Sequence, residues 1–129
     1  MDKISNLLIS LKNGGNAGKE VATLPYSKNL AAIAKTLFDA GYIVSYKKIT
    51  RKNHDALELG IAYTNNGTPR IHDVKRISKP SGRLYAGVHE IRPIKHGHGI
   101  LVLSTPKGIL TGEQAKSEHV GGETLFEIW

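Results

Sequence analysis

The sequence of 129 residues contains no cysteine, which excludes disulfide bonds and thiolate metal sites. Long apolar runs are also missing. No run approaches the roughly 20 residues of a membrane-spanning helix, and the N-terminal segment lacks the apolar centre of a signal peptide. We therefore expect a soluble, cytoplasmic protein.

Aromatic residues are scarce and acidic residues are outnumbered. Aromatic residues make up only 6% of the chain, too few for a platform that stacks the bases of single strands. Eleven Asp and Glu face 18 Lys and Arg, which gives a formal net charge of +7. This charge favours polyanions, because phosphates that bind basic side chains release counterions. The composition therefore favours recognition of folded RNA by its shape, backbone and grooves.

No pattern in the sequence predicts catalysis or a cofactor. His96 and His98 form an H-x-H pair, but no cysteine or suitably spaced carboxylate joins them, so we predict no metal site. Ser104 and His119 lack the G-x-S-x-G elbow and the third partner of a nucleophilic site. No phosphate-binding glycine loop precedes Lys107. We expect no enzyme, no cofactor and no small-molecule substrate.

Two amphipathic helices are predicted in residues 1–77. Apolar residues recur at helical spacing over residues 3–13, where two glycines follow and should end the helix. The same spacing recurs over residues 30–38, with Ser27 as the N-cap and Gly41 as the residue that ends the helix.

Strand patterns complete an N-terminal αβαββ unit with both helices on one face of its sheet. A short edge strand is predicted within residues 18–25, and two further strands over residues 42–49 and 56–63. The Asn65-Asn66-Gly67 turn predicts that a third strand over residues 70–77 pairs back on the preceding one.

Proline, glycine and serine gather in residues 78–83, which predicts a connector between two units of an α+β fold. Residues 84–129 predict a small antiparallel sheet with one short helix. That helix begins at a capping box formed by Thr111 and Gln114. The predicted core of this unit is Ile100, Val102, Leu103, Ile109, Leu110, Val120, Leu125, Phe126 and Ile128.

A polar loop over residues 104–108 follows a continuously apolar run. It offers two hydroxyls, one cation and a terminal glycine, which suit a sugar-phosphate backbone or a base edge. We predict that Ser104 and Thr105 lie together at the exposed end of a buried strand. Gly121 and Gly122 should lie close by and leave the backbone approachable.

This loop, the Thr-x-x-x-Ala helix that follows and the Gly-Gly-Glu start of the last strand resemble the C-terminal signature of the S-eight family of bacterial small-subunit ribosomal proteins. Further segments at residues 2–14, 24–43 and 76–85 also resemble this family, in matching order. At Pro106 the chain departs from the family, which commonly has a second serine there. Proline removes a hydroxyl and a backbone N–H, so that base contact is not carried over.

The resemblance implies a structural constituent of the small ribosomal subunit. Such a protein would bind the central domain of the small-subunit ribosomal RNA directly, support subunit assembly and contact neighbouring small-subunit proteins. Loop chemistry and the resemblance together select the RNA-binding residues Ser104, Thr105, Lys107, Gly108, Tyr85, Gly121, Gly122, Glu123, Lys12, Asn13, Ser27 and Lys28.

Two other functions remain open from the sequence. One is a small nucleic-acid-processing enzyme, which would need carboxylates or histidines that converge on one pocket. The other is a basic protein-interaction module. Binding that weakens steeply with salt would indicate RNA, whereas indifference to salt would indicate the module.

Overall fold

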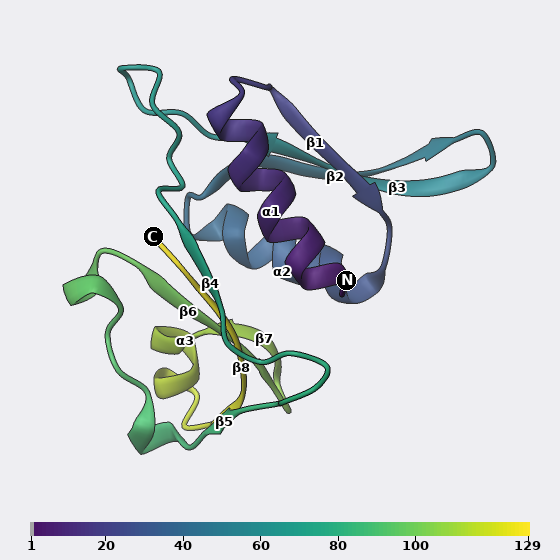
Figure 1. Ribbon diagram of the computed structural model, residues 1–129. Coiled ribbons are helices and arrows are strands. Elements are labelled where there is room, and N and C mark those ends of the chain that lie inside the picture. Colours follow the sequence, from purple (N-terminus) through teal and green to yellow (C-terminus); the bar gives the residue numbers. More distant parts are fainter. Residues whose placement is uncertain (1) are drawn as a thin grey trace. The chain divides into compact units, whose positions relative to one another are not determined.

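The computed structural model describes residues 2–129, apart from the side chain of His96. The chain forms two compact units, the first ending at His72 and the second beginning at Asp73 (Figure 1). Each unit combines helices with an antiparallel sheet, so the predicted two-unit α+β class is confirmed.

The connector predicted at residues 78–83 is wrong, because this segment lies within the second unit. Strand β4 (Val74–Arg76) precedes it and already pairs with β8 (Gly122–Ile128) of that unit. Residues 78–83 instead form a loop, closed by paired backbone hydrogen bonds of 3.0 Å between Lys79 and Gly82. Proline and glycine therefore mark a turn here and not a boundary.

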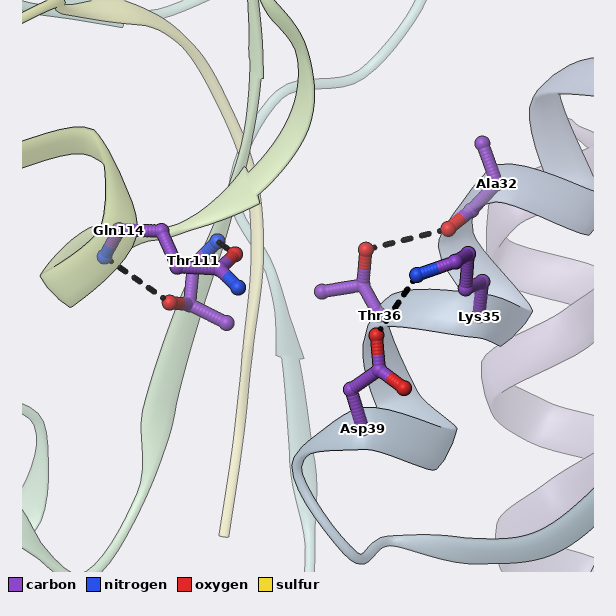
Figure 2. A network of polar contacts seen from close by, with 6 residues as sticks. All are labelled: Ala32, Lys35, Thr36, Asp39, Thr111 and Gln114. Atoms are coloured by element: carbon purple, nitrogen blue, oxygen red, sulfur yellow. Dashed lines mark hydrogen bonds and ion pairs between the residues drawn. The ribbon is translucent and has the colours of Figure 1, made fainter. Parts of the chain in front are cut away.

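The two helices of the first unit are α1 (Lys3–Asn16) and α2 (Lys28–Asp39). The Leu30 N–H donates to the Ser27 hydroxyl at 3.1 Å, which confirms the predicted N-cap. Along α2, the Thr36 hydroxyl donates to the Ala32 carbonyl, and Lys35 pairs with Asp39 at 2.9 Å (Figure 2). Among the described residues, no helix is both long enough and apolar enough to cross a membrane.

Helix α1 continues through Gly14 and Gly15, past the end predicted for it. Both glycines are buried, and a Cβ built on Gly14 would lie 2.6 Å from Cδ1 of Ile61. The glycines therefore let the helix approach the sheet closely. This packing outweighs the low helix propensity of glycine.

The sheet of the first unit contains β1 (Val21–Pro25), β2 (Ile43–Arg51) and β3 (His54–Ile61) in the order β1-β3-β2. Ala22 and Leu24 of β1 are buried and pair with the buried Leu59 and Leu57 of β3, which gives the sheet one core-facing side. The predicted αβαββ unit is therefore confirmed.

The third strand predicted for this sheet is wrong. The turn at Gly67 does form, but it closes only an isolated bridge between Tyr63 and Pro69. Pro69 has no N–H to extend a ladder. The only strand within residues 70–77 is β4, which pairs with β8 of the second unit.

The second unit has a five-stranded sheet built around β8. Strand β6 (Ile100–Thr105) pairs along one edge of β8, and β4 and β5 (Tyr85–Ala86) pair along the other. An unpredicted strand, β7 (Gly108–Thr111), pairs with β6, so the predicted polar loop is a tight turn after Thr105.

One short helix, α3 (Gly112–Ser117), completes the second unit, together with 3-10 turns at Val88–Glu90 and Lys95–Gly97. Its predicted capping box is confirmed. The Thr111 N–H donates to Oε1 of Gln114 at 2.9 Å, and the Gln114 N–H donates to Oγ1 of Thr111 at 3.2 Å (Figure 2).

The predicted core of the second unit is confirmed for its central members. Val102, Leu103, Leu125, Phe126 and Ile128 are buried. Ile100, Ile109, Leu110 and Val120 are half-buried. Ile91, Leu101 and Ala115 are buried residues that the prediction missed.

Candidate nucleic-acid interface

Three strands of the second unit bring Tyr85, Glu123 and Ser104 into one row. Tyr85 of β5 pairs with Glu123 of β8, and Glu123 pairs with Ser104 of β6. Residues that lie directly opposite one another on paired strands project from the same face of a sheet. Tyr85 is 67% exposed, and its two partners are half-buried. The row thus presents a phenol, a carboxylate and a hydroxyl side by side.

Ser104 and Thr105 lie at the half-exposed end of β6, directly after the buried residues 101–103. Their predicted position is confirmed.

A shallow hollow of about 570 Å³ lies beside this row. We call it the β8 hollow, and its lining is Tyr85, Ala86, Gly87, Glu90, Ser104, Thr105, Pro106, Gly121, Gly122 and Glu123. Six of the twelve residues predicted to bind RNA therefore meet in one place: Tyr85, Ser104, Thr105, Gly121, Gly122 and Glu123. Lys107 and Gly108 follow at once in the turn between β6 and β7.

Gly121 and Gly122 serve the packing of strands. A Cβ on Gly122 would lie 2.1 Å from the Ser104 carbonyl oxygen, and a Cβ on Gly121 would lie 2.3 Å from that of Ala86. We predicted that these glycines leave the backbone open to a ligand. The neighbouring strands occupy that space instead. The glycines shape the floor of the hollow by letting three backbones approach one another.

Thr105 uses its hydroxyl inside the turn. The hydroxyl donates to the Gly108 carbonyl at 2.8 Å and accepts from the Lys107 N–H at 3.1 Å. A hydroxyl has one proton to donate and two lone pairs, so one acceptor position remains. The side chain therefore fixes the turn and offers a ligand only a lone pair.

Ser104 differs from its neighbour, because its hydroxyl has no hydrogen-bond partner among the described residues. It can donate one hydrogen bond and accept two from a bound molecule. At the rim, Lys107 pairs with Glu118 at 3.0 Å while both side chains remain about half exposed. An exposed pair of this kind is weak and can exchange partners.

Gly87 and Glu90 line the hollow and were missed by the sequence analysis. Oε1 of Glu90 accepts from the Gly87 N–H at 2.8 Å, which holds the 3-10 turn that follows β5. A Glu three residues after the N-cap position is one half of the capping-box pattern, and the sequence does carry it, although glycine has no side chain to supply the other half. The position of this turn beside Gly121 depends on the pairing of β5 with β8, which no local sequence pattern predicts.

The remaining predicted residues belong to the first unit. Lys12 and Asn13 lie near the C-terminal end of α1, and Ser27 and Lys28 lie at the start of α2. Asn13 and Lys28 are exposed, whereas the Ser27 hydroxyl is engaged in its cap. The contacts predicted for the first unit thus come from two helix ends.

The chemistry of the β8 hollow is that of hydrogen bonding. It contains hydroxyls and two carboxylates, but no histidine and no cation. Among the described residues, no group of three or more His, Cys, Asp or Glu could hold a metal ion. The side chain of His96, one half of the H-x-H pair, lies outside the described residues.

Comparison with known proteins covers nearly the whole chain. A family model described as ribosomal protein S8 matches residues 2–129. The small ribosomal subunit protein uS8 of Halothermothrix orenii is 41% identical over 128 residues, which span 99% of this chain and 97% of that protein. The proteins of the same name from Zymomonas mobilis and Nautilia profundicola are each 38% identical, over 97% and 98% of their lengths. Full-length similarity at this level, on an αβαββ unit followed by a β-rich unit, shows that the chain belongs to the ribosomal protein S8 family.

Proposed function

We propose that this protein binds the central domain of the small-subunit ribosomal RNA directly, with the β8 hollow as its main contact. Membership of the S8 family gives the coarser statement, that the chain is a structural component of the ribosome and not an enzyme. The observation that carries the finer proposal is the row of Tyr85, Glu123 and Ser104 on a chain of net charge +7, in which the Ser104 hydroxyl has no partner among the described residues.

The groups in the hollow select which part of an RNA it receives. Two carboxylates in one hollow repel phosphate but accept hydrogen bonds from base amino groups and ribose hydroxyls. Ser104 can donate to a base or ribose oxygen. Tyr85 is exposed enough to stack on one unstacked base. The hollow therefore suits a distorted or looped segment of a folded RNA, where base edges and riboses are accessible.

Phosphates are bound by cations around the hollow. Lys107 lies in the adjoining turn, and the exposed Lys79 and Arg83 lie on the loop that leads to Tyr85. Each phosphate contact of this kind adds affinity that weakens with salt and carries no sequence information.

The other predicted residues have supporting roles in this proposal. Thr105, Gly108, Gly121 and Gly122 shape the turn and the floor of the hollow. Lys12, Asn13, Ser27 and Lys28 provide backbone contacts from the first unit. Contact with neighbouring small-subunit proteins and a role in subunit assembly extend the same proposal.

The experiment is a filter-binding titration of the full chain against a transcript of the central domain, repeated at several salt concentrations. We expect the logarithm of the affinity to fall linearly with the logarithm of the salt concentration. Ser104→Ala should weaken binding roughly fivefold, because the RNA atom that faced the hydroxyl is left unpaired. Ser117→Ala, an exposed serine on α3, is the matched control and should bind as the parent does.

Two outcomes would overturn the proposal. Affinity that is indifferent to salt would favour a protein-interaction module. Equal affinities of Ser104→Ala, Ser117→Ala and the parent chain would remove the hollow from the interface while leaving RNA binding itself in place.

A further inference from the structure

A buried serine in the second unit is hydrogen-bonded on both its donor and acceptor sides. Ser78 is 0% exposed. Its hydroxyl donates to the Leu84 carbonyl at 3.1 Å and accepts from the Leu84 N–H at 2.9 Å. One side chain thus mimics a strand partner for Leu84 and closes the loop of residues 79–83.

A second hydroxyl reaches the same carbonyl from β8. Thr124 is 8% exposed, and its hydroxyl and its backbone N–H donate to the Leu84 carbonyl at 3.1 and 2.9 Å. The Ser78 N–H in turn donates to the Thr124 carbonyl at 3.2 Å. Ser78 and Thr124 therefore fix the backbone of Leu84 to β8 from two sides.

The fixed backbone carries side chains that point outwards. The Leu84 side chain is 56% exposed although its N–H and carbonyl are fully engaged, and Tyr85 follows directly. Tyr85 is paired with Glu123, the residue before Thr124. The position of Tyr85 in the hollow thus depends on hydrogen bonds between the adjacent residues, Leu84 before Tyr85 and Thr124 after Glu123.

We infer that Ser78 is a positioning residue for RNA recognition, which holds Tyr85 in register with Glu123 and Ser104 without touching the RNA. Strand β5 has only two residues, so its ladder with β8 contains only two paired positions, and the hydrogen bonds at Leu84 add to them. A one-residue slip would turn Tyr85 to the opposite face of the sheet. The Ser78 hydroxyl prevents that slip, because it forms hydrogen bonds with both the N–H and the carbonyl of Leu84. A preformed register also reduces the conformational-entropy cost of binding, because the loop need not become ordered when RNA binds.

This inference rests on the proposed function, and a double-mutant cycle separates it from a purely structural role. The variants are Ser78→Ala, Tyr85→Ala and the pair, with affinity for the central-domain transcript measured per folded molecule. Ser78→Ala should weaken binding roughly fivefold in the parent chain and change it little when Tyr85 is already alanine. Amide exchange of Leu84 and Tyr85 should rise in Ser78→Ala. Ser81→Ala, an exposed serine of the same loop, is the control and should match the parent chain.

Thr124→Val is a second, shape-conserving variant in case Ser78→Ala does not fold. It removes one donor to the Leu84 carbonyl and should show the same coupling to Tyr85 with a smaller loss of affinity. The inference fails if Ser78→Ala lowers stability but leaves affinity per folded molecule unchanged. It also fails if Ser78→Ala weakens RNA binding by the same factor in the parent chain and in the Tyr85→Ala variant. If Tyr85→Ala alone has no effect while the parent chain binds RNA, then the proposed contact at Tyr85 fails and the coupling vanishes with it.

Discussion

The two units reach close packing by different means. In the first unit, a Cβ added to Gly14 would meet the end of the Ile61 side chain, and one added to Gly60 would meet side chains of Ser45 and Val44. In the second unit, the corresponding contacts of Gly121 and Gly122 are with backbone atoms. Buried hydroxyls follow the same division. Thr36 bonds within its own helix, whereas Ser78 and Thr124 bridge separate segments.

This difference shows where each unit tolerates change. Side chains can shift by a few tenths of an ångström, whereas a backbone in a sheet cannot shift without losing its ladder. The first unit is therefore stabilised mainly by apolar helix faces. The second unit also has a buried apolar core, and in addition it depends on close strand approach and on shared backbone hydrogen bonds around β8. The candidate RNA-binding row lies in the second unit, where the backbone has less freedom to shift.

A matched pair of glycine substitutions tests this comparison, and it should show the largest effect. Gly122→Ala should lower the free energy of unfolding by more than about 4 kcal/mol, because its Cβ would lie 2.1 Å from a backbone oxygen. Gly14→Ala should change it by less than about 1 kcal/mol, because the helix propensity of alanine offsets a shift of the Ile61 side chain. Urea unfolding of both variants measures the difference. Equal losses would refute the distinction between the units.

Truncation in the apolar core of the first unit should rank second. Leu37→Ala removes a side chain that is fully buried in α2, and should cost about 3 kcal/mol through lost burial and the cavity left behind. Amide exchange would locate the loss in α2 and the strands against which it packs. A cost below about 1 kcal/mol would show that the helix is not held by its apolar face.

The Ser27 cap should have an intermediate effect. Ser27→Ala removes the acceptor for the Leu30 N–H and should cost about 1 kcal/mol of stability. Ser27→Asp keeps a capping acceptor and should retain stability, but it adds an anion where RNA contact is proposed. Thermal unfolding and RNA titration of both variants separate the two roles. Unchanged affinity of Ser27→Asp would remove this helix start from the interface.

Lys107 should matter little for folding and more for RNA. Its ion pair with Glu118 is exposed, so Lys107→Ala should change the free energy of unfolding by less than about 0.5 kcal/mol. The salt dependence of RNA binding should fall by roughly one ion. Lys28→Ala should do the same if the first unit also contacts phosphate. Lys116→Ala is the control for net charge. If it lowered the salt dependence of RNA binding as much as Lys107→Ala does, the effect would come from net charge and not from the position of Lys107.

The smallest effect concerns Lys35 on α2. Its pKa is raised above the ordinary 10.5 by the hydrogen bond that the Lys35 ammonium donates to Asp39 and by the charge of that carboxylate. Because the pKa of Lys35 is higher in the folded state than in the unfolded state, its pairing stabilises the fold fully at pH values below the unfolded-state pKa. This stabilisation is lost as the pH rises through the folded-state pKa. Lys35→Met should therefore reduce the fall in stability above about pH 10. An identical pH profile in both chains would show that the pair contributes nothing.

Local signals in the sequence were sufficient for the helix starts. Ser27 and the Thr111–Gln114 box act within one helical turn, so their spacing alone predicts their bonds. The hydroxyl pair at the end of β6 was also predictable, because it follows an apolar run directly. What a residue does within its own turn can be read from its neighbours in the chain.

Features that depend on distant partners were not predictable. The pairing of β4 with β8 joins segments far apart in sequence, and the pattern of residues 70–77 fits a strand in either sheet. The row of Tyr85, Glu123 and Ser104 requires two registers at once, one of them set by a two-residue strand. The roles of Gly14, Gly121 and Gly122 likewise depend on what packs against them.

The central position of β8 has a consequence for folding during synthesis. Every strand pairing within the first unit joins residues that precede His72, so the sheet of that unit needs no residue of the second unit. Strands β4, β5 and β6 all pair with β8, which is synthesised after each of them. Their unpaired edges are open to wrong partners in the meantime. The candidate RNA-binding row is therefore complete only once β8 has been made, and the proposed RNA contact depends on that strand.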